Sequence, residues 1–110
     1  MVCALLGTIR TGTSQTTTAV VNQYCVGCHN EKAKIGGLAL DPNHIADRPA
    51  DWEKAVRKLR ARYMPPAGLP RPDEHTYETL VASIEGTLDH AAAAKPNPGR
   101  TDTFRRLNRT

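Results

Sequence analysis

Large aromatic side chains are scarce in this sequence of 110 residues, which contains one Trp, three Tyr and one Phe. A domain of this size buries only a modest fraction of its surface and is often stabilised by a metal or another additional group. The scarcity therefore favours a small core completed by a bound group, although helices rich in Ala and Leu also build small cores.

The sequence also lacks long apolar runs and dense basic runs. No apolar run approaches the roughly 18 residues of a membrane-spanning helix, so we expect no membrane insertion. The formal net charge is +4, but Lys and Arg are spread along the chain, which favours a solvated surface over nucleic-acid binding. Residues 1–14 have no basic region ahead of a short apolar stretch, so we expect a disordered leader or a signal-peptide remnant.

Cysteines are few and odd in number, which argues against a disulfide framework. Cys3 is isolated, whereas Cys25 and Cys28 are followed directly by His29. This Cys-x-x-Cys-His pattern is typical of the attachment of c-type haem. Two thiols at this spacing can reach two vinyl groups on one edge of a porphyrin, and the adjacent imidazole can then bind the iron. We therefore predict one covalent haem c on Cys25 and Cys28, with His29 as an iron ligand.

Two other interpretations of these cysteines stay open. A structural zinc site takes four ligands, but the chain has no second Cys pair, and His44, His75 and His90 lack the close spacing of a paired His motif. A thioredoxin-like redox pair lies in an α/β setting, and no segment alternates like a strand.

Met64 is the candidate for the second iron ligand. It follows His29 by 35 residues, at the predicted end of a helix and directly before Pro65 and Pro66. A thioether on such a stiff loop can reach the opposite face of the ring without bringing charge into an apolar pocket. His44 is the alternative second ligand.

Hydrophobic periodicity predicts three helices. The first is capped by Ser14 and runs into Cys25 with one apolar face (Val20, Val21, Tyr24). The second begins at Asp51 and ends at Met64, with a stripe at helical spacing (Trp52, Ala55, Val56, Leu59, Tyr63). The third begins near Asp73 and stops before Pro96, with another stripe (Tyr77, Leu80, Val81, Ile84, Leu88). The predicted fold class is all-α.

The segments Tyr24 to His29 and Met64 to Pro66, together with the last helix, resemble the class I cytochrome c family over residues 15–92. The resemblance implies three to four helices around one covalently bound haem, with the first helix crossing the last. It also implies that the haem is lined by Trp52, Val56 and Leu59. Arg60 flanks that stripe and either pairs with a haem propionate or stays solvated.

The same resemblance implies one-electron transfer with His/Met ligation, without catalysis by the domain alone, and a redox partner protein or adjacent domain. It implies a periplasmic or otherwise extracytoplasmic location. Two alternatives remain: a haem enzyme or gas sensor with a displaceable sixth ligand, and a zinc-binding structural module.

A narrower resemblance concerns two short segments. Residues 36–41 and 107–110 are similar to cytochrome modules of large multidomain proteins from planctomycete- and acidobacteria-type bacteria. This implies that the chain is a module of a larger protein. We therefore expect a leader or signal-peptide remnant over 1–14, a cytochrome c domain over 15–92 and a linker toward a following domain over 93–110.

Overall fold

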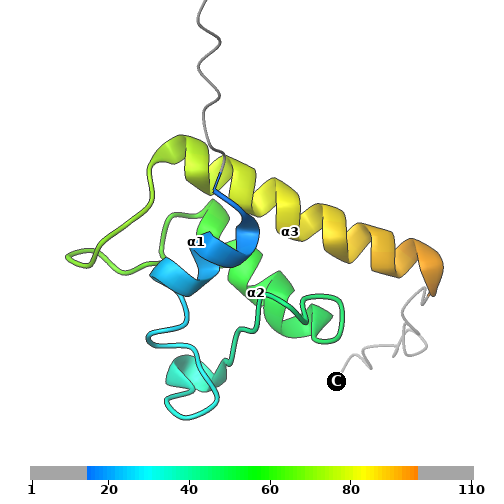
Figure 1. Ribbon diagram of the computed structural model, residues 1–110, viewed down its shortest axis with the longest axis horizontal. Helices are drawn as coiled ribbons and strands as arrows, with labels where there is room; N and C mark the ends of the chain where they lie inside the picture. Colours follow the sequence, from blue (N-terminus) through cyan, green and yellow to red (C-terminus); the bar gives the residue numbers. More distant parts are fainter. Residues whose placement is uncertain (1–14, 97–110) are drawn as a thin grey trace, which may run out of the picture.

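The structure is a computed structural model that describes residues 15–96, and these residues form helices joined by loops (Figure 1). The elements are α1 (Thr17–Tyr24), the short 3₁₀ helix η1 (Ile35–Gly37), α2 (Pro49–Arg60) and α3 (Glu74–Ala94). The described part of the chain contains no strand, so the predicted all-α class is confirmed. None of its helices is long and apolar enough to span a membrane.

Helix α1 is short and carries the apolar face that the sequence predicts. Val20 and Val21 are buried, and Tyr24 packs partly buried against the core. The helix is capped by Thr16, whose hydroxyl accepts a hydrogen bond from the amide of Ala19 at 3.2 Å. The predicted cap, Ser14, lies outside the described residues.

Helix α2 begins and ends earlier than predicted. It starts at Pro49, because a proline is well suited to the first helical turn, where its missing N–H is not needed. It ends at Arg60 rather than at Met64, since Arg62 adopts a left-handed conformation with φ 58°. The predicted last member of the stripe, Tyr63, therefore leaves the helical face and is 68% exposed, so its assignment to the core was wrong.

Helix α3 is the longest element and agrees with the prediction at its start. The carboxylate of Asp73 accepts a hydrogen bond from the amide of Thr76 at 2.7 Å, which caps the helix. Four members of the predicted stripe are buried: Tyr77, Leu80, Val81 and Ile84. The fifth, Leu88, is partly buried and packs against the core.

The helices α1 and α2 both pack on α3, and within residues 15–96 they make no comparable contact with each other. Figure 1 shows α1 and α2 on the same side of α3, whose C-terminal part extends past both. The core therefore forms along one face of α3, and side chains of all three helices border the space between α1 and α2.

Candidate functional site

A cleft of about 300 Å³ lies between α1, α2 and α3, and most of its lining is apolar. The four residues that the sequence singles out all line it: Cys25, Cys28, His29 and Met64. They come from the end of α1, from the turn after it and from the loop between α2 and α3. The cleft thus combines two thiols, an imidazole and a thioether on apolar walls.

The two cysteines lie where α1 ends and the chain turns. The amide of Cys25 donates to the carbonyl of Val21 at 2.9 Å, which continues the helical hydrogen bonding by one residue. Cys25 is half-buried and Cys28 is exposed, and both are free thiols. Burial raises the pKa of Cys25 to about 11, so this thiol is neutral at physiological pH.

Asn30 holds the turn that carries the cysteines. Its side-chain amide donates to the carbonyl of Val26 at 2.8 Å, and its side-chain carbonyl accepts from the amides of Lys32 and Ala33. The loop then returns to the site, because the amide of Leu40 donates to the carbonyl of His29 at 2.9 Å. The backbone of His29 is therefore fixed from both directions.

The two ring nitrogens of His29 differ in their surroundings. Nδ1 is buried and has no hydrogen-bond partner within residues 15–96, whereas Nε2 is not among the buried unpartnered atoms of these residues. The imidazole as a whole lines the cleft.

Met64 lies in the loop after α2 and is half-buried. Its peptide bond to Pro65 is cis, and Pro65 and Pro66 line the cleft beside it. Its carbonyl oxygen accepts a hydrogen bond from the hydroxyl of Tyr77 in α3 at 3.0 Å. The sequence placed Tyr77 in the apolar stripe of the last helix and did not predict this contact. The available signal was that a buried tyrosine needs a partner for its hydroxyl.

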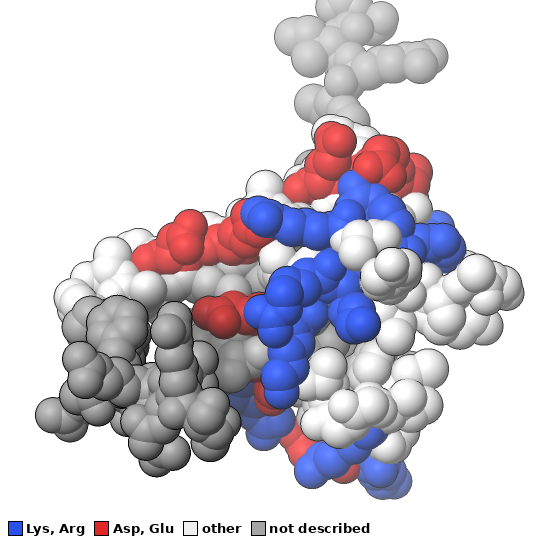
Figure 2. Space-filling model, turned by 180° about the vertical axis from the view of Figure 1, so that it is seen from behind, with Lys and Arg blue, Asp and Glu red and all other residues white. Residues whose placement is uncertain are grey.

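One expectation about the walls of the cleft needs correction, and Arg60 has a partner that the sequence did not predict. Trp52 and Leu59 line it as predicted, but Val56 lies in a separate groove toward α3, and Ala55 takes its place. Arg60 does not line the cleft, because its guanidinium forms an ion pair with Glu85 of α3. Figure 2 shows that Lys and Arg side chains gather on one face of the molecule and that acidic side chains lie beside them.

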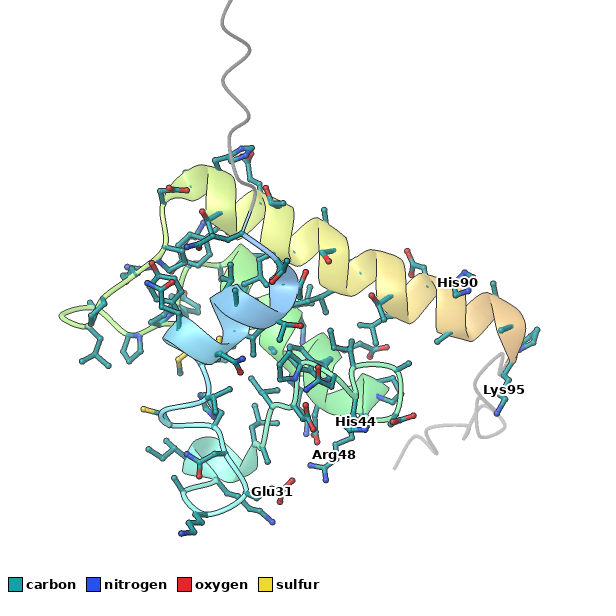
Figure 3. The ribbon with its side chains drawn as sticks, viewed as in Figure 1. Glu31, His44, Arg48, His90 and Lys95 are labelled. Atoms are coloured by element: carbon teal, nitrogen blue, oxygen red, sulfur yellow. The ribbon has the colours of Figure 1, made fainter. Side chains whose placement is uncertain are left out.

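The remaining histidines lie away from the cleft. His44, the alternative ligand, is exposed, and its Nδ1 lies 2.7 Å from a carboxylate oxygen of Asp41, whose hydrogen bond raises the pKa of His44. Figure 3 shows His44 near the start of α2 and His90 on the far part of α3. Neither residue, nor His75, lines the cleft.

The lining of the cleft suits an apolar group that carries a metal and a hydrogen-bond acceptor. Trp52 lines it, is 1% exposed, and its indole Nε1 has no hydrogen-bond partner in the described part of the chain. A buried N–H without a partner is costly, so an acceptor on a bound group suits this position. By contrast, no three His, Cys, Asp or Glu side chains within residues 15–96 lie close enough together to hold a metal ion, whereas structural zinc takes four ligands.

Comparison with known proteins agrees with this geometry. The family model described as cytochrome c oxidase, cbb3-type, subunit III matches residues 12–84, which is about two thirds of the chain. No significant match is found among curated proteins or among solved structures. The described helices and the family match together define a small all-α cytochrome c domain. The chain belongs to this cytochrome c family, whose members carry electrons on a covalently bound, iron-containing haem c.

Proposed function

We propose that this domain transfers single electrons through one haem c attached to Cys25 and Cys28, with His29 and Met64 as the two axial ligands of the iron. The observation that carries the proposal is that one apolar cleft is lined by these four side chains, which come from separate parts of the chain. When bound, haem c supplies an iron that changes between the ferric and ferrous states.

The residues of the cleft have distinct roles in this proposal. Cys25 and Cys28 hold the group covalently at the end of α1, and His29 offers Nε2 to the iron. The Met64 thioether binds from the loop after α2 and favours the ferrous state, which raises the reduction potential. The apolar walls exclude water, and the indole N–H of Trp52 donates to an acceptor on the bound group.

The setting of the domain is part of the proposal. Because c-type haem is attached outside the bacterial cytoplasm, we place the domain in the periplasm or another extracytoplasmic compartment. We further propose that it is a module of a larger multidomain protein of the planctomycete or acidobacteria type. In this arrangement residues 1–14 form a leader, residues 15–92 the cytochrome c domain and residues 93–110 a linker, and a redox partner or adjacent domain takes the electron.

A visible absorption spectrum tests the proposal directly. The chain is expressed with export and with the haem-attachment machinery, and the purified ferric protein is expected to show the weak red band of a methionine-ligated haem. The matched variants Cys25→Ala and Cys28→Ala are each expected to reduce covalent haem, measured on denaturing gels by haem staining.

Other outcomes would favour other functions. A ferric protein without the red band, whose reduced form binds carbon monoxide readily, would contradict electron transfer with His/Met ligation and favour a gas sensor or haem enzyme. A colourless protein with stoichiometric zinc would remove the haem proposal altogether.

A further inference from the structure

A chain of hydrogen bonds joins the Met64 loop to the start of α3. The hydroxyl of Tyr77 donates to the carbonyl oxygen of Met64 at 3.0 Å and accepts from Nε of Arg71 at 3.1 Å. Nη2 of Arg71 donates in turn to the carbonyl of Arg62. The backbone is therefore held at Met64 and again two residues before it.

Tyr77 is itself held firmly in place. Its side chain is 3% exposed, and the guanidinium carbons of Arg62 and Arg71 lie 4.5 and 5.8 Å from the centroid of its ring. Arg62 also forms an ion pair with Glu74 in the first turn of α3, and its Nη1 donates to the carbonyl of Leu59 at 2.6 Å. The phenol is thus fixed by contacts from the end of α2, from the loop and from its own helix.

The carbonyl of Met64 is an effective point at which to hold this loop. The two residues after Met64 are prolines, which have no N–H and so cannot be anchored through donated backbone hydrogen bonds. A hydrogen bond to the Met64 carbonyl is the nearest backbone anchor to the thioether. Arg62, in the left-handed conformation, ends α2 and directs the chain toward Tyr77.

We propose that Tyr77, supported by Arg71, is a positioning residue for Met64: its hydroxyl fixes the Met64 carbonyl and thereby the direction from which the thioether enters the cleft. This inference rests on the proposed ligation of iron by Met64. It assigns Tyr77 a role beyond the core, because a movement of the loop that carries Met64 away from the iron would distort or break this hydrogen bond.

Competition with an added ligand measures this role. Imidazole displaces the thioether from ferric haem, so its apparent affinity rises as Met64 is held less well. The Tyr77→Phe variant keeps the ring and loses the hydroxyl, which leaves the Met64 carbonyl without its partner. We expect imidazole to bind about tenfold more tightly to this variant, and a tenfold change corresponds to about 1.4 kcal/mol, within the range of one hydrogen bond.

The experiment uses the full chain with haem attached and follows the loss of the red band at fixed pH. Arg71→Gln removes the donor to the Tyr77 hydroxyl from an exposed site, and we expect about a threefold increase in imidazole affinity even if Tyr77→Phe folds poorly. The matched control is Tyr63→Phe, one residue from Met64, whose hydroxyl is hydrogen-bonded to no residue within 15–96 and whose ring is exposed. Val20→Ala is the second control, because it weakens the core in α1 at a residue that is 2% exposed and does not line the cleft.

Each outcome decides between the possibilities. Unchanged imidazole affinity in folded Tyr77→Phe overturns the positioning role while leaving Met64 as ligand. Equal increases in Tyr77→Phe and Val20→Ala also overturn it, since the effect would then follow general stability. If the unmodified protein shows no red band, ligation by Met64 is wrong, and the positioning role is wrong with it.

Discussion

Ile84→Ala probes the place where α3 supports the rest of the domain. Ile84 is 0% exposed, belongs to the core cluster with Val20 and Val21 of α1, and also borders the cleft. The substitution removes roughly three carbon atoms at about 0.8 kcal/mol each, or about 2.4 kcal/mol of transfer free energy. The cavity left behind adds to this, so we expect a loss of about 3 kcal/mol within the 2–5 kcal/mol range of such core substitutions. For a domain of this size, Tm should fall by roughly 10–20 °C.

The assay is urea denaturation of the haem-loaded protein, followed by far-ultraviolet circular dichroism. The matched control is Ile35→Ala in η1, because the same atoms are removed from a side chain that is 54% exposed. We expect the control to change the free energy of unfolding by less than about 0.5 kcal/mol. A loss below about 1 kcal/mol for Ile84→Ala, or equal losses for the two variants, would refute the assignment of this α3 face to the core.

Three further predictions concern the ligand, the cleft wall and the helix cap. Met64→Ala should abolish the red band of the ferric protein and let the ferrous protein bind carbon monoxide rapidly, and retention of the band would exclude Met64 as the ligand. Trp52→Phe removes the buried donor Nε1, so the reduction potential should fall as negative charge on the bound group is less well stabilised; a redox titration giving an unchanged potential would contradict this contact. The hydrogen bond from the Thr76 amide lowers the pKa of Asp73, so its stabilising effect is present above the ordinary aspartate pKa of about 4 and is lost as pH falls through the lowered value. The unmodified protein should therefore have a higher Tm than Asp73→Asn near neutral pH, and this difference should disappear in acid. A difference that persists in acid would show that the carboxylate charge of Asp73 is not its cause.

The sequence predicts the helices well where periodicity and capping act locally. The spacing from Tyr77 to Ile84 corresponds to a buried face, and Asp73 caps α3 as two acidic residues before a stripe indicate. The grouping of the cysteine motif with Met64 at one cleft was also expected, because motif spacing and the proline pair carry that information.

Errors arise where side chains act across long separations. Arg62 ends α2 early through its hydrogen bond to Leu59 and its ion pair with Glu74, twelve residues away. Periodicity extended the stripe to Tyr63 because it contains no information about such contacts. For the same reason the sequence left Arg60 between a haem propionate and solvent and did not predict its ion pair with Glu85 in the next helix.

Helix α3 links the two sides of the cleft although it carries none of the four ligating or attaching residues. Its middle packs against α1, which leads into the cysteines and His29, and its first turns hold the Met64 carbonyl through Tyr77. Within residues 15–96 it is the helix that contacts both α1 and α2, so it helps to set the relative position of His29 and Met64, together with the buried loop residues Leu40 and Ile45. Core substitutions in the middle of α3 should therefore act mainly through stability, whereas loss of the Tyr77 hydroxyl near its start should also change how well Met64 is held.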